Sequence, residues 1–201
     1  MKKSGSKRKR SRIGILGGVF DPIHIGHLLL AQRAKESFSL EQVLFVPAGR
    51  PPHRTLPHAS GKDRLEMVQL TVRDERGFSV SDIEMKNSGT RFTYDTLDYF
   101  SGLHPEWEIF LIIGVDNAKS FDSWKNWREI LKRWHVVAGT RPGLKAVKNL
   151  GRGKLGIELF PMPLIGTSSS EIRKRVNKGF SCRWLLSPQV EEYIHAKNLY
   201  R

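Results

Sequence analysis

The residue types best suited to chemistry stand together at positions 17–27, in the string GGVFDPIHIGH. An apolar run at 13–16 precedes it, so we expect a buried strand to end where the two glycines begin. Glycines permit a sharp turn and a close approach of the backbone to a ligand. His24 and His27 are three residues apart, so a helical turn would put both imidazoles on one face. Imidazoles and free amides at a helix start can donate to phosphate. HxGH alone is also compatible with a turn and two surface histidines, but the complete string favours a phosphate site made of Gly17, Gly18, Val19, Phe20, His24, Gly26 and His27.

A second string, TSSSEIR at 167–173, is typical of a helix start. Ser168 and Glu171 stand at capping-box spacing, which by itself predicts a capped helix and nothing more. The functional interpretation is that amides and hydroxyls at such a start bind phosphate with the help of the helix dipole. Arg173 would add a planar, permanently charged guanidinium. This second phosphate site would consist of Ser168, Ser169, Ser170 and Arg173.

Together the two strings resemble the signatures of the HxGH nucleotidylyltransferases, and most closely those of the bacterial nicotinate-nucleotide adenylyltransferases. The family pattern at the second string is ISSTxIR, and this chain has Thr167 for the isoleucine and Ser170 for the threonine. The resemblance implies transfer of the adenylyl group of ATP to nicotinate mononucleotide, with release of pyrophosphate, to give the dinucleotide precursor of NAD. It also implies that His24 and His27 contact and stabilise the reacting phosphates, with Arg173 as the third catalytic residue.

Further segments match the same family. PAGRPPHR at 47–54 resembles its PxxxPPH[KR] loop, FTYDTL at 92–97 its [YF]TxDTL element, and GVD at 114–116 its GxD. AGTRPG at 138–143 resembles VAxRPG with one extra residue. In the family the threonine of the [YF]TxDTL element lies against the nicotinate ring, and that position is Thr93 here. An aromatic side chain stacks on the same pyridine ring, and its position is Trp124. Trp127, Leu131 and Trp134 complete a helical stripe with Trp124 and are expected to pack in the core. The resemblance implies a mononucleotide site made of His53, Arg54, Thr93, Asp116, Trp124 and Arg141.

The implied reaction needs no nucleophile from the protein. A phosphate monoester has a second pKa near ~6, so it is largely dianionic at neutral pH and can attack the α-phosphate of ATP directly, without a covalent intermediate. We therefore expect catalysis by positioning and by stabilisation of the charge that develops in the transition state. Mg²⁺ is expected to arrive with ATP, held by phosphate oxygens and water, with no ligands from the protein.

Strand-like and helix-like segments alternate along the chain, which predicts an α/β fold: a doubly wound, mostly parallel, Rossmann-like sheet with a small C-terminal helical part. WEIFLII at 107–113 is apolar nearly throughout, as in parallel strands covered on both faces. In such sheets, ligands bind at the carboxyl ends of the strands where the winding reverses. The segment 151–156 matches the GxGxxG pattern of dinucleotide-binding proteins. That motif must open a helix, but here it leads into a strand-like segment, so we interpret it as a basic loop and not as a dinucleotide site. We expect strands at 13–16, 42–46, 78–85, 107–113, 135–138 and 157–160, and helices at 25–38, 62–72, 94–103, 169–177 and 188–197.

Length and composition suit a single domain. Of the 201 residues, 1–11 are expected to form a basic tail and 12–201 one nucleotidyltransferase domain. Cys182 is the only cysteine, so an intramolecular disulfide is excluded. The single cysteine favours a reducing compartment, so we expect a cytoplasmic protein. No apolar run approaches the roughly 20 residues of a membrane span, so we expect no membrane partner. The formal net charge is +14, and seven positive charges fall within the first twelve residues. A nucleic-acid partner is therefore expected, if at all, only through the tail.

Other functions stay open at this point. One is adenylyl transfer to a different phosphate, such as phosphopantetheine or nicotinamide mononucleotide, against which the segments at 47–54 and 92–97 argue. Another is an RNA-binding protein on a nucleotidyltransferase scaffold, which rests on the tail and the net charge. A regulatory protein that has lost catalysis is disfavoured by the intact motifs. The expected partners are ATP and nicotinate mononucleotide, and whether the protein forms a homo-oligomer is left open.

Overall fold

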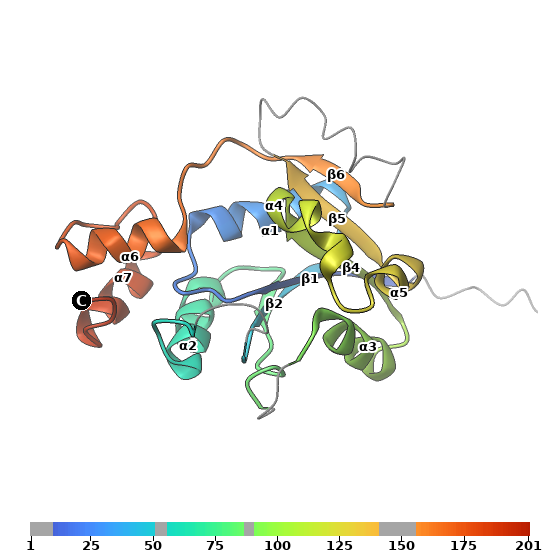
Figure 1. Ribbon diagram of the computed structural model, residues 1–201, viewed down its shortest axis with the longest axis horizontal. Helices are drawn as coiled ribbons and strands as arrows, with labels where there is room; N and C mark the ends of the chain where they lie inside the picture. The colour runs from blue at the N-terminus through green and yellow to red at the C-terminus, as the bar shows by residue number, and fades with distance from the viewer. Residues whose placement is uncertain (1–9, 51–55, 87–90, 141–155) are drawn as a thin grey trace, which may run out of the picture.

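The computed structural model describes residues 10–50, 56–86, 91–140 and 156–201. At its centre lies a six-stranded sheet in which every neighbouring pair of strands is parallel (Figure 1). The strand order is β3-β2-β1-β4-β5-β6, so the chain winds outward from β1 to β3, returns to place β4 beside β1, and then winds the other way. The predicted doubly wound α/β sheet is therefore confirmed. Its strands are β1 (Ser11–Gly18), β2 (Gln42–Pro47), β3 (Phe78–Val80), β4 (Trp107–Gly114), β5 (His135–Thr140) and β6 (Glu158–Pro161).

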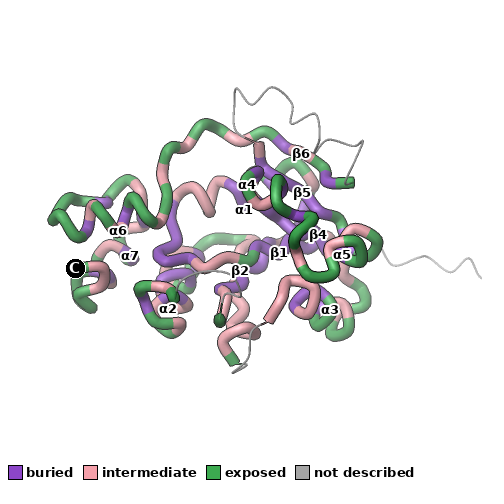
Figure 2. The backbone as a smooth tube through the Cα atoms, viewed as in Figure 1, coloured by how far each residue is buried: buried purple, intermediate pink, exposed green. Residues whose placement is uncertain are grey.

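Helices cover both faces of the sheet, and the buried strands separate two apolar clusters (Figure 2). On β4, Phe110 and Ile112 belong to the cluster that includes residues of α1, α2, α6 and α7. The alternate residues Ile109, Leu111 and Ile113 belong to the cluster with α3 and α5. This is the two-sided burial expected of a continuous apolar strand. The helices are α1 (Ile25–Ser37), α2 (Gly61–Val72), α3 (Thr93–Leu103), α4 (Val115–Lys119), α5 (Trp127–Arg133), α6 (Ser169–Asn177) and α7 (Pro188–Ala196), with a short 3₁₀ turn, η1, at Phe121–Ser123.

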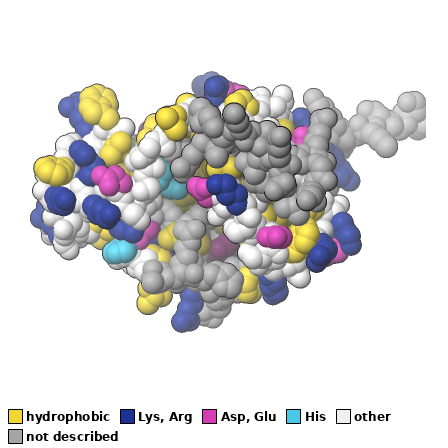
Figure 3. Space-filling model, turned by 45° about the horizontal axis from the view of Figure 1, so that its top comes forward, with side chains coloured by type: hydrophobic (Ala, Val, Ile, Leu, Met, Phe, Trp, Pro, Cys, Tyr) yellow, Lys and Arg dark blue, Asp and Glu magenta, His cyan; other side chains and the backbone are white. Residues whose placement is uncertain are grey.

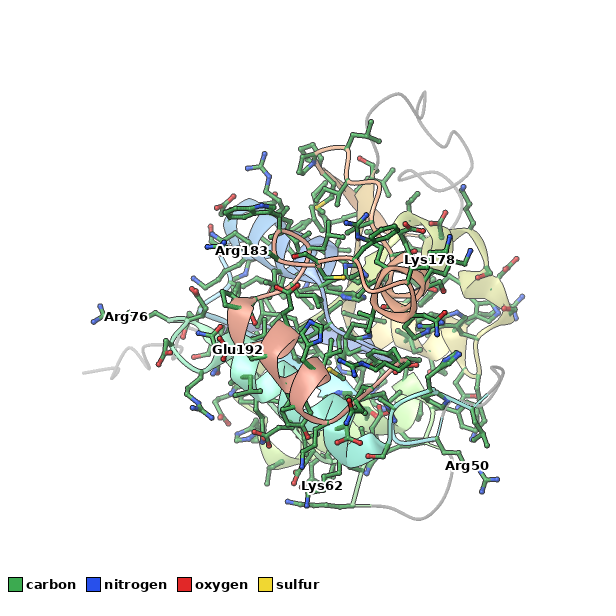
Figure 4. The ribbon with its side chains drawn as sticks, turned by 90° about the vertical axis from the view of Figure 1, so that its left-hand side faces the viewer. Arg50, Lys62, Arg76, Lys178, Arg183 and Glu192 are labelled. Atoms are coloured by element: carbon green, nitrogen blue, oxygen red, sulfur yellow. The ribbon has the colours of Figure 1, made fainter. Side chains whose placement is uncertain are left out.

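The last two helices form the small C-terminal part that the sequence predicts. They lie at one end of the molecule, beside α2 and the start of α1 (Figure 1). Figure 4 views this end directly, with α7 against α2. The carbonyl of Leu185, between α6 and α7, accepts a hydrogen bond from the amide of Ile25 at 2.9 Å. The C-terminal part is therefore attached to the first residue of α1, at the edge of the sheet where ligands are expected.

Two sequence predictions fail in detail. The strand expected at 78–85 ends at Val80, because the carbonyl of Asp82 accepts from the amides of Met85 and Lys86 and closes a turn. The helical stripe expected from Trp124 to Trp134 is also wrong at its ends, although Trp127, Leu131 and Trp134 belong to or pack against one apolar cluster as expected. Trp124 has an extended backbone after η1, and Asn126 adopts a left-handed conformation (φ 57°) directly before α5.

Within the described part of the chain, no helix has the length and apolar character needed to cross a lipid bilayer.

Candidate active site

A cavity of about 1120 Å³ opens at the carboxyl ends of β1 and β4, where the winding of the sheet reverses. Pockets for small ligands measure roughly 300–1,000 Å³, so this cavity is slightly larger than that range. In Figure 3, histidine atoms are visible in the hollow between the C-terminal helices and the body of the molecule. The predicted site residues on its wall are Gly17, Gly18, Val19, Phe20, His24, His27, Thr93, Asp116, Trp124, Ser168, Ser169, Ser170 and Arg173. Three more, His53, Arg54 and Arg141, lie outside the described residues.

The two histidines of the first string stand side by side at the start of α1, with ring centroids 3.9 Å apart. Nδ1 of His24 accepts a hydrogen bond from the amide of Gly26 at 3.1 Å. Nδ1 of His27 accepts one from the amide of His24 at 3.2 Å. A nitrogen that accepts a hydrogen bond carries no proton, so a neutral ring must hold its proton on Nε2. The backbone therefore fixes each ring as an Nε2–H donor.

Both imidazoles are neutral at pH 7. Burial lowers the pKa of His24 from 6.5 to about 4, since only 8% of this residue is exposed. Burial also lowers the pKa of His27, and the neighbouring His24 lowers it further. Each ring can donate one hydrogen bond to an anion without the cost of first placing a positive charge in a buried site.

The backbone amides of this helix start are not the free phosphate donors that the sequence predicts. The amide of Ile25 donates to Leu185, that of Gly26 to the His24 ring, and that of His27 to the carbonyl of His24 at 2.8 Å. Gly26 itself is absent from the cavity wall. A Cβ on Gly26 would lie 2.9 Å from Cε1 of His24, so this glycine makes room for the imidazole.

The second string reaches the same cavity from the other end of the chain. Ser168 caps α6 by accepting from the amide of Glu171 at 3.2 Å, as the spacing predicts. The hydroxyl of Ser169 donates to the carbonyl of Pro22 at 2.9 Å. Arg173 donates from Nη1 to the carbonyl of Asp21 at 2.7 Å. The two strings are therefore hydrogen-bonded to each other. The start of α6, with the positive end of its helix dipole, and the two imidazole donors thus lie at the same cavity.

A different part of the wall is formed around the start of α3. Thr93 is the first residue of this helix, and Asp95 caps it by accepting from the amide of Phe92 at 3.2 Å. Trp124 lines the same cavity with its ring 5.1 Å from that of Phe121. Because Trp124 precedes α5 in an extended conformation, its indole is placed separately from Trp127 and Trp134. Asp116, in the first turn of α4, forms an ion pair with Lys119 at 3.5 Å.

Charged side chains that sequence reasoning missed also border this part of the cavity. Lys125 places its ammonium 4.4 Å from the centre of the Phe92 ring. Arg91 also lines the wall. Glu84 accepts a hydrogen bond from Thr96 at 2.7 Å, and burial raises the pKa of this carboxyl above its usual value. The wall around Thr93 and Trp124 therefore has two cations, Arg91 and Lys125, and two acids, Asp116 and Glu84, of which Glu84 has a reduced tendency to ionise.

Arg64, which is only 1% exposed, was missed although its position in the sequence contains a signal. It shares a helical face with Met67 and Val68, so it has to be buried with them. Its Nη1 donates to the carbonyls of Val19 at 2.7 Å and Ala48 at 2.8 Å, and Nη2 to that of Gly49 at 3.3 Å. This guanidinium joins the loops that follow β1 and β2, and so holds the shape of the cavity without lining it.

No group of three or more His, Cys, Asp or Glu side chains suited to a metal ion occurs among the residues whose structure is described. The carboxylate of Asp21, which lines the cavity, already accepts hydrogen bonds from two amides and from Tyr200.

Comparisons with known proteins identify the family of this chain. The family described as cytidylyltransferase-like matches residues 15–175. A protein of Desulfitobacterium hafniense (strain Y51), named "Probable nicotinate-nucleotide adenylyltransferase", is 38% identical over 198 residues, which cover 94% of this chain and 96% of that protein. A protein of the same name from Thermus thermophilus is 40% identical over 190 residues, with coverage of 94% and 100%.

Among solved structures, the fold is similar to that of the Plasmodium falciparum nicotinic acid mononucleotide adenylyltransferase complexed with NaAD. The TM-score is 0.81 at 22% identity, and the match covers 94% of this chain and 97% of that one.

Proposed function

Because this chain belongs to the nicotinate-nucleotide adenylyltransferases, which are nucleotidyltransferase enzymes, we propose that it transfers the adenylyl group of ATP to nicotinate mononucleotide in NAD biosynthesis. The main support from the structure is the convergence of the two predicted phosphate strings. The bonds from Ser169 to Pro22 and from Arg173 to Asp21 bring the start of α6 to the loop after β1, at one cavity. This is where an α/β sheet of this topology binds its ligands.

In the proposed reaction, a phosphate oxygen of the mononucleotide attacks the α-phosphorus of ATP. The new P–O bond forms as the bond to the β-phosphate oxygen breaks, and pyrophosphate leaves with that electron pair. No proton needs to be removed from the attacking dianion, so the protein's work is to hold two anions together and to stabilise the charge that develops. The Nε2–H groups of His24 and His27 and the guanidinium of Arg173 are the donors that we assign to this task.

Mg²⁺ is part of the proposal as the companion of the ATP phosphates, where it would neutralise charge on the phosphate oxygens. A Mg²⁺ ion bound in this way keeps much of its water and takes few ligands from the protein. Asp116 is the carboxylate at the cavity wall with the greatest exposure, so it is the side chain that we would test as an additional ligand.

We further propose that the cavity prefers the acid, nicotinate, over its amide. The assignment of Thr93 and Trp124 to the pyridine ring rests on the family motifs. The cations Arg91 and Lys125 border the same part of the wall and would favour a ligand carboxylate electrostatically. Equal specificity constants for nicotinate mononucleotide and nicotinamide mononucleotide would refute this preference.

The test of the function is pyrophosphate release from ATP with a panel of acceptors: the two mononucleotides and phosphopantetheine. We expect release with nicotinate mononucleotide above all. His27→Ala should lower kcat by about a hundredfold or more, as expected for the loss of a transition-state donor. His195→Ala is the matched control, because His195 is an exposed histidine of α7 outside the cavity wall. Near-normal turnover of a folded His27→Ala protein would remove His27 from the catalytic set, and no release with any acceptor would overturn the function.

A further inference from the structure

The carboxylate of Asp21 is a meeting point for segments that are distant in the sequence. Asp21 is only 4% exposed, and its carboxylate oxygens accept three hydrogen bonds from neutral donors. The amide of His58 donates to Oδ2 at 2.8 Å, and the amide of Ala59 to Oδ1 at 3.0 Å. The third donor is the hydroxyl of Tyr200, which donates to Oδ1 at 2.8 Å. A buried carboxylate needs such donors because it has lost its water.

A permanent cation faces the same carboxylate without a hydrogen bond to it. Nη1 of Arg173 is 3.8 Å from Oδ2 of Asp21, whereas it is 2.7 Å from the main-chain oxygen of the same residue. A charge-assisted bond to the carboxylate would be about 2.7–2.9 Å long. The guanidinium is thus held by a neutral carbonyl, and Nη2 donates to Ser170 at 3.2 Å. In this position Arg173 lines the cavity.

The ring of Tyr200 is firmly placed. Its backbone has a φ of 65°, which is uncommon for a residue with a bulky side chain and persists where the surroundings enforce it. The side chain packs against the cluster that includes residues of α1, α2, α6 and α7. Burial raises the pKa of Tyr200, and the charge of Asp21 raises it further, so the hydroxyl remains a proton donor at neutral pH.

We propose that Tyr200 is a positioning residue for Arg173, and that its hydroxyl satisfies Asp21 so that the guanidinium stays available to substrate phosphate. Without this hydroxyl, Oδ1 would keep only the amide of Ala59 as a donor in a buried site. Two side chains lie near the other carboxylate oxygen, the exposed imidazole of His58 at 3.5 Å and the guanidinium of Arg173 at 3.8 Å, and Arg173 is the one with a permanent charge. The arginine would then close its 3.8 Å gap to the carboxylate and turn its charge away from the cavity. This inference rests on the proposed function in one respect, the role of Arg173 in binding phosphate.

The chain offers a matched control for the test. The hydroxyl of Tyr193 donates to Oδ1 of Asp63 at 2.9 Å, which is the same kind of bond from the same C-terminal part. Neither Tyr193 nor Asp63 lines the cavity. Tyr193→Phe and Tyr200→Phe each remove one hydroxyl and keep the ring, so a general loss of stability should affect both variants.

The first experiment is calorimetric titration of the full chain with inorganic triphosphate, accompanied by thermal unfolding of each variant. We expect Tyr200→Phe to raise the dissociation constant about tenfold, equivalent to about 1.4 kcal/mol. Tyr193→Phe should leave the constant within about twofold of wild type, which is about 0.4 kcal/mol. Equal affinities in the two variants would overturn the proposal, and so would a wild-type protein that does not bind triphosphate.

The second experiment separates this proposal from a purely structural role and from the proposed function. In an Asp21→Asn background there is no charge to attract Arg173, so adding Tyr200→Phe should change triphosphate affinity less than about twofold. A tenfold loss in that background would mean that Tyr200 acts in another way, and the proposal would be wrong. If the wild type binds triphosphate but releases no pyrophosphate with any acceptor, the proposed function fails while the role of Tyr200 is still decided by the affinities.

Discussion

The low pKa of His24 predicts how the stability of the free protein depends on pH. Lowering this pKa from 6.5 to about 4 corresponds to about 3 kcal/mol between the two protonation states, at about 1.4 kcal/mol for each pKa unit. Between these pH values the unfolded chain takes up a proton on His24 and the folded protein does not. The free energy of unfolding must therefore fall as the pH decreases from about 6.5 to about 4, and it regains this contribution above 6.5.

Urea unfolding between about pH 7.5 and about pH 4 measures this effect, with His24→Asn as the comparison. Asparagine keeps an acceptor near the position of Nδ1 for the amide of Gly26, but it does not titrate. We expect wild type to lose about 3 kcal/mol more than the variant over this range. NMR titration of the His24 ring gives the pKa directly. A ring that titrates near 6.5, or parallel pH profiles for the two proteins, would refute the argument that burial keeps this imidazole neutral.

Four further variants test the site and the elements that surround it. Gly49→Ala should destabilise the fold by about 1–3 kcal/mol in urea unfolding, because its Cβ would collide with the backbone carbonyl of Glu84. In contrast, a Cβ at Gly102 in α3 would have no atom within 4 Å, so Gly102→Ala should stabilise the fold by about 0.5 kcal/mol. A Gly49→Ala protein more stable than the Gly102→Ala protein would contradict both expectations. Arg64→Met should lower the free energy of unfolding by about 3 kcal/mol or more, because three carbonyls lose their donor. An unchanged urea midpoint would mean that these hydrogen bonds do not hold the two loops together. Trp124→Ala should raise the KM for the mononucleotide more than that for ATP in steady-state assays, and equal changes would argue against the assigned ring contact.

The parts of the fold that follow from local patterns could be predicted from the sequence. The apolar run at 107–113 becomes β4 in the middle of the sheet, and the strings at 17–27 and 167–173 meet at one cavity. The strand expected at 78–85 fails after Val80 because a turn at Asp82 replaces pairing with β2. Alternation of apolar residues does not reveal such a turn. The amides of Met85 and Lys86 can bond either to a neighbouring strand or to the carbonyl of Asp82 within the turn, and the side-chain pattern does not distinguish these two outcomes.

The site was predictable in its residue types and less so in its hydrogen bonds. The glycine of HxGH was expected to make room for an anion, but Gly26 makes room for the ring of His24. The burial of Arg64 could have been inferred from its helical face, but its carbonyl partners, like the contact of Tyr200 with Asp21, depend on elements that come together only in the tertiary structure. A short window of sequence contains no information on partners that are so far apart, so these positioning residues emerge only from the coordinates.

The hydrogen bonds at the Asp21–Pro22 corner connect residues that are 147, 152 and 179 positions apart. Contacts of such long sequence separation form slowly, because closing a large loop costs entropy before any bond repays it. During refolding from urea, secondary structure measured by circular dichroism should therefore return before affinity for triphosphate does. We therefore expect the cavity to become able to bind triphosphate late in folding, once both distant parts of the polypeptide have docked.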